Sequence, residues 1–305
     1  MENAAVRVRN LRKTYGSRAA VDDVSFDIIR GETFALLGPN GAGKSTTVEI
    51  LEGYRRRTSG EVTVLGDDPG HAGLAWKARL GIVLQTTGQA GAFTVREQLR
   101  QFAGYYPRPR DVEEVIAAVG LEEKANTRIS KLSGGQQRRV DVALGIIGNP
   151  ELLFLDEPTT GFDPQARREF WSLIRRLQDE GTTILLTTHY LDEAAQLADR
   201  VAVIDRGLLQ AIGPIATFGG EDARMPRVTW REGGALHTES TPAPWAFARS
   251  LAERLGGEPE ELEIRRPTLE DIYLGMVDPE AAATPDEAVA PASSSPTSSI
   301  PESLS

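Results

Sequence analysis

An apolar run that ends in a glycine-rich loop constrains the fold of this chain more than any other feature. The run is 34–37, and Gly38-Pro39-Asn40-Gly41-Ala42-Gly43-Lys44-Ser45 follows it directly. A continuous apolar run predicts a buried central strand, and a helix is predicted to begin near Gly43. Glycines let successive backbone N–H groups turn toward one anion, and the positive end of the helix adds to the attraction. The segment therefore predicts a phosphate-binding loop between a strand and a helix.

The loop matches every fixed position of the pattern G-x-x-x-x-G-K-[ST]. In this pattern Lys44 neutralises the β- and γ-phosphates of a nucleotide, and the Ser45 hydroxyl ligates Mg²⁺. A glycine turn without a ligand is the alternative, which the flanking strand and helix disfavour. The nucleotide-binding residues predicted in this segment are Gly38, Pro39, Asn40, Gly41, Ala42, Gly43, Lys44, Ser45 and Thr46.

Two adjacent carboxylates follow a second apolar run. Asp156 and Glu157 come directly after 152–155, so both are predicted at the carboxyl edge of a strand, where ligands bind in open α/β sheets. Asp156 is predicted to hold Mg²⁺, directly or through water. Glu157 is predicted to accept a proton from the attacking water or to polarise it. Two solvated acids at a strand end are the alternative, and the phosphate loop upstream disfavours it.

The segment Leu132-Ser133-Gly134-Gly135-Gln136 lies between these two motifs. In this order the three motifs resemble those of the ATP-binding cassette (ABC) ATPases, and the resemblance covers residues 5 to about 215. The segment 132–136 resembles the signature of that family, which completes the ATP site of a neighbouring subunit. One copy per chain therefore implies that two chains meet around ATP. Ser133, the N–H groups of Gly134 and Gly135, and the helix that follows are predicted to form an anion site, to which Gln136 is also assigned. A serine-capped helix with a glycine turn is the alternative, which the neighbouring motifs disfavour.

The resemblance implies roles for four further residues. Gln85 follows a predicted strand end and matches a glutamine that touches Mg²⁺ and the attacking water. His189 matches the switch histidine, which contacts the γ-phosphate and supports Glu157. Tyr15 matches the residue that stacks on adenine, with a core aromatic as the alternative. Asp163, in a segment where Phe162 replaces the usual leucine, contributes to the site and is also expected to cap a helix.

The pattern of the chain predicts an α/β fold with a P-loop NTPase core, an antiparallel β subdomain and a helical signature subdomain over about 86–150. Thr94 and Glu97 form a capping box at the start of one helix in that subdomain, and 111–119 is a second helix. We expect an ABC nucleotide-binding domain at 1–217 and a small α+β accessory domain at 218–277. The Ala-, Pro- and Ser-rich acidic tail at 278–305 is expected to be disordered.

Composition narrows the class of protein. The formal net charge is −10, and five acidic residues but no lysine or arginine lie in 278–305, so charge argues against a nucleic-acid partner. The absence of cysteine excludes disulfides and thiolate metal sites. No apolar run reaches the roughly 18 residues that span a bilayer, and the start lacks the pattern of a secretory signal.

Three segments, 153–161, 186–194 and 266–273, are similar to the branch of the family that serves separate drug- or antibiotic-export membrane subunits. This resemblance implies an ATP-hydrolysing subunit that forms a homodimer with ATP and powers a separate transmembrane permease. It would act as a peripheral protein at the cytoplasmic face of the membrane, with ATP and Mg²⁺ as cofactors. A soluble, non-transport ABC ATPase is the alternative, but the chain has neither a coiled coil between its halves nor a second cassette. A binding module without turnover is disfavoured by Glu157 and His189.

Overall fold

The two apolar runs predicted as buried strands, 34–37 and 152–155, lie in a six-stranded central sheet with the order β5-β6-β7-β3-β8-β9. The computed structural model describes residues 3–84, 92–160 and 162–277. Strands β5 to β8 and β3 are parallel, and β9 pairs antiparallel with β8. Every residue of β3 and β7 is buried, as expected for a parallel sheet that is covered on both faces.

The strands are β1 (Ala4–Tyr15), β2 (Arg18–Ile29), β3 (Thr33–Leu37), β4 (Ser59–Val64), β5 (Leu80–Val83), β6 (Leu152–Asp156), β7 (Thr183–Thr187), β8 (Arg200–Asp205), β9 (Leu208–Pro214), β10 (Arg227–Glu232), β11 (Ala235–Ser240) and β12 (Glu260–Arg265). The α-helices are α1 (Lys44–Leu51), α2 (Leu74–Lys77), α3 (Val95–Ala103), α4 (Val112–Ala118), α5 (Gly134–Ile146), α6 (Pro164–Asp179), α7 (Leu191–Leu197), α8 (Gly220–Ala223), α9 (Pro244–Leu255) and α10 (Leu269–Val277). Short 3₁₀ helices occupy Glu122–Lys124, Ile129–Lys131 and Ile215–Thr217.

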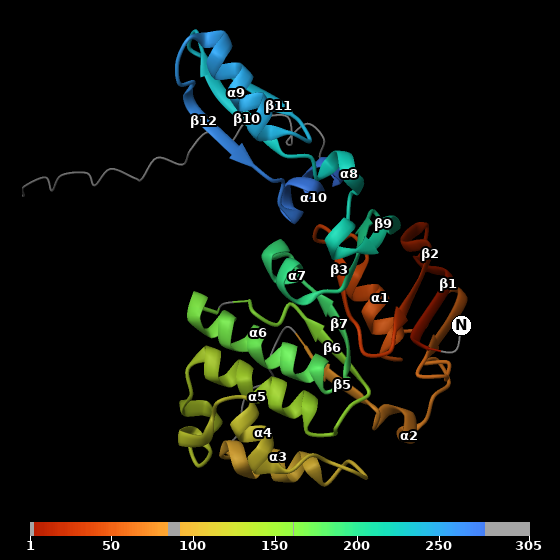
Figure 1. The fold of residues 1–305 in the computed structure, drawn as a ribbon. Helices are drawn as coiled ribbons and strands as arrows, with labels where there is room; N and C mark the ends of the chain where they lie inside the picture. The colour runs from red at the N-terminus through yellow and green to blue at the C-terminus, as the bar shows by residue number, and fades with distance from the viewer. Residues whose placement is uncertain (1–2, 85–91, 161, 278–305) are drawn as a thin grey trace, which may run out of the picture.

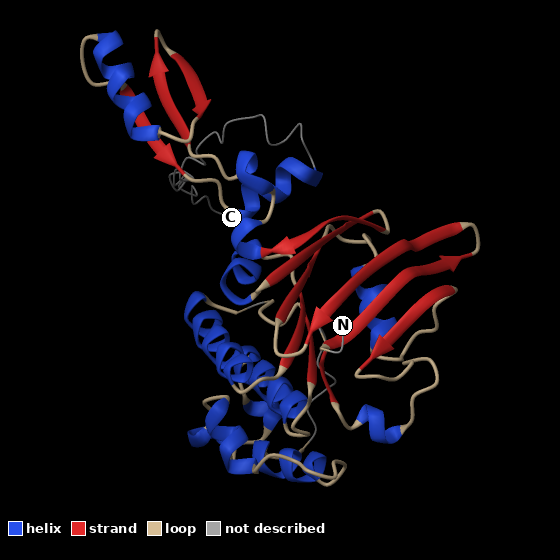
Figure 2. Cartoon of the chain, turned by 45° about the vertical axis from the view of Figure 1, so that its right-hand side comes forward, coloured by secondary structure: helices blue, strands red, loops and turns tan. Residues whose placement is uncertain are grey.

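A second, antiparallel sheet with the order β2-β1-β4 covers one side of the cassette. Its apolar side chains share one core with α1 and the central sheet. Within that core Phe26 of β2 stacks on Phe34 of β3, with ring centroids 5.4 Å apart. Figure 2 shows this sheet on one side of the central strands and most of the helices on the other. The predicted antiparallel subdomain is confirmed, although β4 was not foreseen.

The helical block α3–α5 packs with α6 on the opposite side of the central sheet, around a separate apolar core (Figure 1). The predicted helix starts are present. Thr94 and Glu97 form the capping box of α3, and Asp111 accepts hydrogen bonds from the N–H groups of Glu113 and Glu114 at the start of α4. These local signals fix where α3 and α4 begin. The predicted bounds of about 86–150 for the helical subdomain stay a prediction.

A small C-terminal unit, made of the sheet β11-β10-β12 and α9, stands away from the cassette in Figure 1. Its core is built on Val228, Trp230 and Leu251. The helices α8 and α10 lie between this unit and the cassette (Figure 1). The predicted boundary at residue 217 stays a prediction. The tail predicted at 278–305 lies outside the described residues.

Among the helices of the described ranges, none is both long and apolar enough to cross a bilayer.

Candidate functional site

The phosphate loop joins β3 to α1 and needs glycine at two points where the backbone passes close to other chain segments. A Cβ at Gly38 would lie 2.1 Å from the carbonyl oxygen of Ile204. A Cβ at Gly43 would lie 2.4 Å from the carbonyl oxygen of Ala20, and Gly43 has a φ of 109°. Any larger residue would displace the loop, because such separations are far below van der Waals contact. The loop conformation is therefore fixed by packing against β2 and β8.

Lys44 at the start of α1 is buried and folds back on the loop. Its ammonium donates to the carbonyl oxygens of Gly38 and Pro39, at 2.6 and 3.1 Å. Burial lowers the pKa of Lys44, and the nearby Glu157 and Asp156 carboxylates oppose that effect. The cation thus lies between the loop and the acidic edge of the sheet.

The acidic edge is built where β6 and β7 end side by side. The Thr187 hydroxyl donates to the Asp156 carboxylate, and the Glu157 N–H donates to the Thr187 carbonyl oxygen at 3.0 Å. Glu157 has a φ of 45°, a backbone region that costs a residue with a side chain on the order of 1 kcal/mol. Its Oε2 lies 3.4 Å from Nδ1 of His189. The contacts with Thr187 and His189 hold Glu157 in this conformation at the end of β6.

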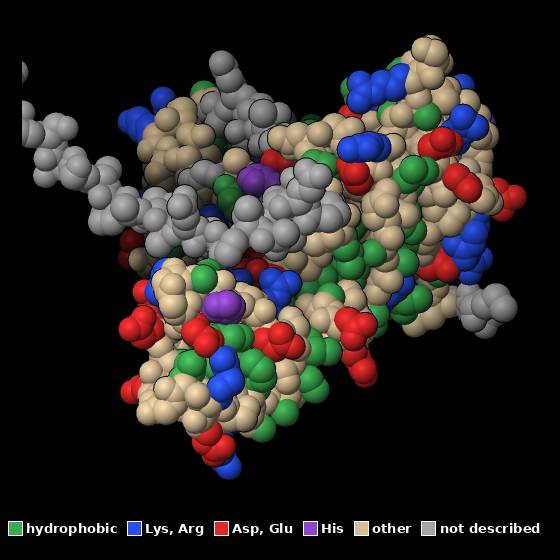
Figure 3. All heavy atoms as spheres, turned by 90° about the horizontal axis from the view of Figure 1, so that it is seen from above, with side chains coloured by type: hydrophobic (Ala, Val, Ile, Leu, Met, Phe, Trp, Pro, Cys, Tyr) green, Lys and Arg blue, Asp and Glu red, His purple; other side chains and the backbone are tan. Residues whose placement is uncertain are grey.

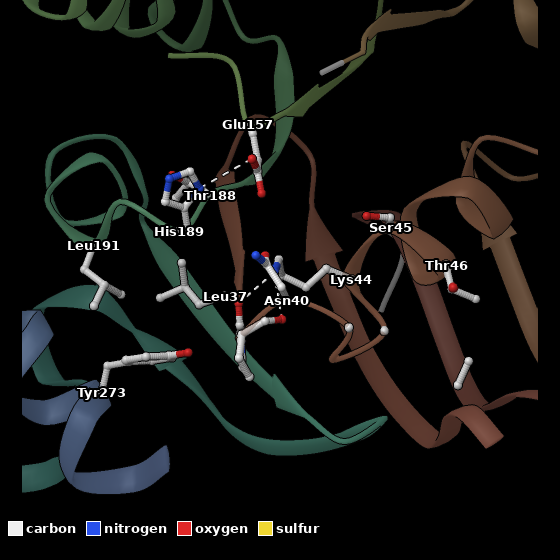
Figure 4. Close-up of a pocket in the computed structure, with 15 residues that line it drawn as sticks. Leu37, Asn40, Lys44, Ser45, Thr46, Glu157, Thr188, His189, Leu191 and Tyr273 are labelled. Atoms are coloured by element: carbon white, nitrogen blue, oxygen red, sulfur yellow. Dashed lines mark hydrogen bonds and ion pairs between the residues drawn. The ribbon is translucent and has the colours of Figure 1, made fainter. Parts of the chain in front are cut away.

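These segments enclose a cavity of about 560 Å³. Figure 4 shows Glu157 and His189 on one side of it and the loop residues Asn40 and Lys44 on the other. The predicted residues that line the cavity are Gly38, Pro39, Asn40, Gly41, Gly43, Lys44, Ser45, Thr46, Glu157 and His189. Thr188, Leu191 and Tyr273 also line it. They belong to the segments 186–194 and 266–273, but they were not predicted as site residues.

Four other predicted residues lie near this cavity or outside the described structure. Ala42 is buried within the loop, and Asp156 reaches the site through Thr187. Gln85 lies outside the described residues. Tyr15 is about half exposed on β1, with Lys13 and Arg55 over its ring at 5.0 and 5.5 Å. The predicted stacking of this ring on adenine stays a prediction.

The signature residues line a different cavity, of about 380 Å³. Ser133 caps α5, since its hydroxyl accepts from the N–H of Gln136, whose side chain accepts from the N–H of Ser133. No atom lies within 4 Å of a Cβ placed on Gly134 or Gly135, so the backbone there is open to an approaching group. Asp163 caps α6 by accepting from the N–H of Ala166 at 2.8 Å and lines the same cavity. One chain thus carries two separate half-sites.

Arg138, on α5 two residues beyond the signature segment, is a link that the sequence did not reveal. It is buried, and its guanidinium donates to the carbonyl oxygens of Pro158 and Asp156, at 3.0 and 3.1 Å, and to that of Leu84. The signature helix is therefore tied to the ends of β5 and β6, which carry the acidic edge.

The fold and the two half-sites define the class: an ATPase of the cassette type, in which a phosphate loop and a signature lie on the same chain but line separate cavities. Comparison with known proteins places the chain more closely. Residues 21–160 match the family model described as ABC transporter.

Similar proteins indicate the same family. The chain is 37% identical over 299 residues to the Nod factor export ATP-binding protein I of Bradyrhizobium diazoefficiens, covering 90% of this chain and 97% of that protein. It is 46% identical over 209 residues to the protein of the same name from Rhizobium johnstonii, covering 67% of each. A dimeric, post-hydrolysis structure of the ATP-binding cassette MJ0796 with ADP and Pi superimposes with a TM-score of 0.63 at 25% identity, over 69% of this chain and 98% of that one.

The chain therefore belongs to the ABC transporter family. It is an ATP-binding subunit that hydrolyses ATP, works as a dimer and acts with a separate membrane subunit.

Proposed function

We propose that this chain is the ATPase subunit of an exporter, bound to the cytoplasmic face of the membrane. The proposal is supported by the likeness to relatives named as export ATP-binding proteins. The transported molecule is proposed to be a hydrophobic compound such as a drug or antibiotic. Transport into inverted membrane vesicles, with this chain and its membrane subunit together, tests both the direction and the class of cargo.

The observation that carries the mechanism is the separation of the two half-sites. Lys44 and Glu157 line one cavity, whereas Ser133 and Asp163 line the other. Within one chain the signature has no phosphate to bind. Across a two-fold axis each signature closes on the nucleotide held by the partner, and ATP favours the closed dimer by its higher affinity for that form.

Hydrolysis is proposed to use the carboxylate over the loop. Glu157 takes a proton from a water molecule as the oxygen of that water bonds to the γ-phosphorus. The bond from the γ-phosphorus to the bridging oxygen breaks, and its electron pair leaves with ADP. His189, 3.4 Å from Glu157, orients that carboxylate and reaches the γ-phosphate. Lys44 and the loop N–H groups stabilise the charge of the phosphates.

The oxygen donors present fit Mg²⁺. The oxygen atoms of Ser45 and Asp156 are hard ligands of the kind that Mg²⁺ prefers. The described residues contain no group of three or more His, Cys, Asp or Glu that could hold a metal by protein ligands alone. An ion that keeps water and phosphate oxygens in its shell needs few protein ligands. Bound there with Gln85 as a further proposed ligand, Mg²⁺ would supply positive charge to the phosphate oxygens.

Two surfaces bear on the partners. Leu84 and Phe93, on either side of the segment 85–91, are 56% and 47% exposed, and we propose that this edge of the helical block receives a cytoplasmic segment of the membrane subunit.

Figure 3 shows Lys and Arg interspersed with Asp and Glu over the visible face. Such a mixed face offers no basic stripe for a nucleic acid.

The test of the catalytic assignment is Glu157→Gln, which keeps the size of the side chain but cannot take a proton. We expect ATP to bind, turnover to fall by about 100-fold or more, and an ATP-bound dimer to accumulate on size-exclusion chromatography. Glu123→Gln, the same change at an exposed carboxylate in the helical block, is the control and keeps parent activity. Parent turnover in Glu157→Gln would refute the assignment.

A further inference from the structure

The last described helix returns from the C-terminal unit and packs on the cassette. Leu269 and Ile272 of α10 are buried in one apolar core with residues of β3, α7 and β8. The contact with the segment after β9 is close, because a Cβ at Gly219 would lie 2.5 Å from Cγ2 of Ile272. The α10 helix thus packs on α7, in a core that includes residues of β3, the strand that leads into the phosphate loop.

The start of α10 is also fixed to the C-terminal unit. The hydroxyl and N–H of Thr268 donate to the Asp271 carboxylate at 2.8 and 2.6 Å, and the Asp271 N–H donates to the Thr268 hydroxyl at 3.2 Å. Arg265, the last residue of β12, donates to Asp271 at 3.1 Å. Few bonds separate the edge of the C-terminal sheet from the helix that packs on the cassette, so a displacement of one displaces the other.

One side chain of α10 reaches the ATP site. Tyr273 is half-buried and lines the cavity that holds Lys44, Glu157 and His189. Figure 4 shows its ring extending from α10 toward the start of the phosphate loop, on the side where Leu191 and His189 lie and opposite Ser45 and Thr46. The ring therefore borders the side of the cavity on which Leu191 and His189 lie.

We propose that Tyr273 is a residue of the nucleotide site, whose ring forms a wall at the γ-phosphate end of the cavity and joins α10 and the C-terminal unit to ATP binding. The proposal rests on the proposed function, because it takes Glu157 and His189 to mark the end where the γ-phosphate lies. Tyr273 is a positioning residue in this reading. Its ring excludes water beside the loop residues Pro39 and Asn40, and no proton transfer is assigned to it.

The protonation state of the phenol agrees with that place. Burial, together with the nearby Asp205 carboxylate, raises the pKa of Tyr273 above its usual value near 10. The side chain is therefore neutral at physiological pH and adds no negative charge beside a triphosphate. Its effect on binding should come from packing and exclusion of water.

The test compares ATP and ADP binding to the full chain, measured by displacement of a fluorescent nucleotide. Tyr273→Ala removes the wall and should weaken ATP binding by about fivefold while ADP binding changes by less than about twofold, because ADP lacks the γ-phosphate. Tyr273→Phe keeps the ring and should restore the parent ratio of the two affinities. Leu274→Ala, on the same helix at a position that is 37% exposed and does not line the cavity, is the control and should leave both affinities unchanged.

The other outcomes contradict the assignment. If Tyr273→Ala bound ATP and ADP with the parent ratio of affinities, the ring would not act at the γ-phosphate. An equal loss of both affinities would show that the residue only supports folding. A Phe variant as weak as the Ala variant would show that the hydroxyl, not the ring, makes the contact. If the parent chain bound neither nucleotide, the proposed function would fail, whereas parent-like selectivity in Tyr273→Ala counts against this assignment alone.

Discussion

Replacing Arg138 with methionine should show how strongly the signature helix is held to the catalytic edge. Arg138 is 7% exposed, and its guanidinium donates to three carbonyl oxygens, those of Leu84, Asp156 and Pro158. Methionine fills much of the same space but donates nothing, so these oxygens lose a charged donor in a buried place. At about 1 to 1.5 kcal/mol for each of the three lost partners, the free energy of unfolding should fall by roughly 3 to 4.5 kcal/mol.

The effect should depend on pH through Asp141. Burial raises the pKa of Asp141 to about 6, and Arg138, whose Nη1 lies 3.8 Å from Asp141 Oδ2, opposes that rise. Without Arg138 the pKa of Asp141 rises further. The carboxyl is protonated and neutral well below pH 6, so Arg138→Met should cost less stability at pH 5 than at pH 8.

Urea unfolding followed by circular dichroism measures both effects. Arg139→Met is the matched control, since the neighbouring Arg139 pairs with the half-exposed Glu169 and should cost about 1 kcal/mol or less. The reasoning is refuted if the two methionine variants lose the same free energy at pH 8, or if the cost of Arg138→Met does not change with pH.

Two further predictions concern the phosphate loop and its helix. Burial, then repulsion from Asp156 and Glu49, raises the pKa of Glu52 from 4.5 to about 7, so the folded chain binds the proton more tightly and stability falls as the pH rises from 4.5 to about 7. Glu52→Gln should remove that fall and raise the free energy of unfolding at pH 8 by about 2 to 3 kcal/mol in urea titrations, whereas an unchanged pH slope would contradict it. Gly43→Ala should lower the melting temperature and abolish ATP binding, because its Cβ would lie 2.4 Å from a carbonyl oxygen. Gly41→Ala, with a φ of 80° and nothing within 4 Å, should cost only about 1 kcal/mol, and equal losses would count against the packing argument.

Local chemistry made much of this fold predictable. The capping box of Thr94 and Glu97, the cap at Asp111 and the continuous apolar runs of β3 and β7 each depend on neighbours in the sequence. The hairpin between β8 and β9 turns at Arg206 and Gly207, which both have positive φ as a tight hairpin turn requires. The strand β11 escaped prediction because all six of its residues are exposed, so no apolar alternation marks it.

The site was less predictable wherever distant segments meet. The phosphate loop and the acidic pair have a fixed spacing and chemistry, and the structure brings them to one cavity. No local pattern shows that Arg138 is buried, that Glu157 adopts a positive φ, or that Tyr273 comes back to the loop from the far end of the chain. Such features depend on tertiary contacts, for which a single sequence carries no periodic signal.

Mixing two inactive variants would show directly whether each ATP site is shared between chains. Lys44→Ala removes the loop cation of one chain, and Ser133→Arg blocks the signature of another. In a mixed dimer one site unites both defects and the other is intact, so equal mixing should restore about a quarter of the parent ATPase rate, because half of the dimers carry one good site. If each chain instead completes its own site, every chain in the mixture stays defective, and the absence of any recovered activity would contradict the shared site.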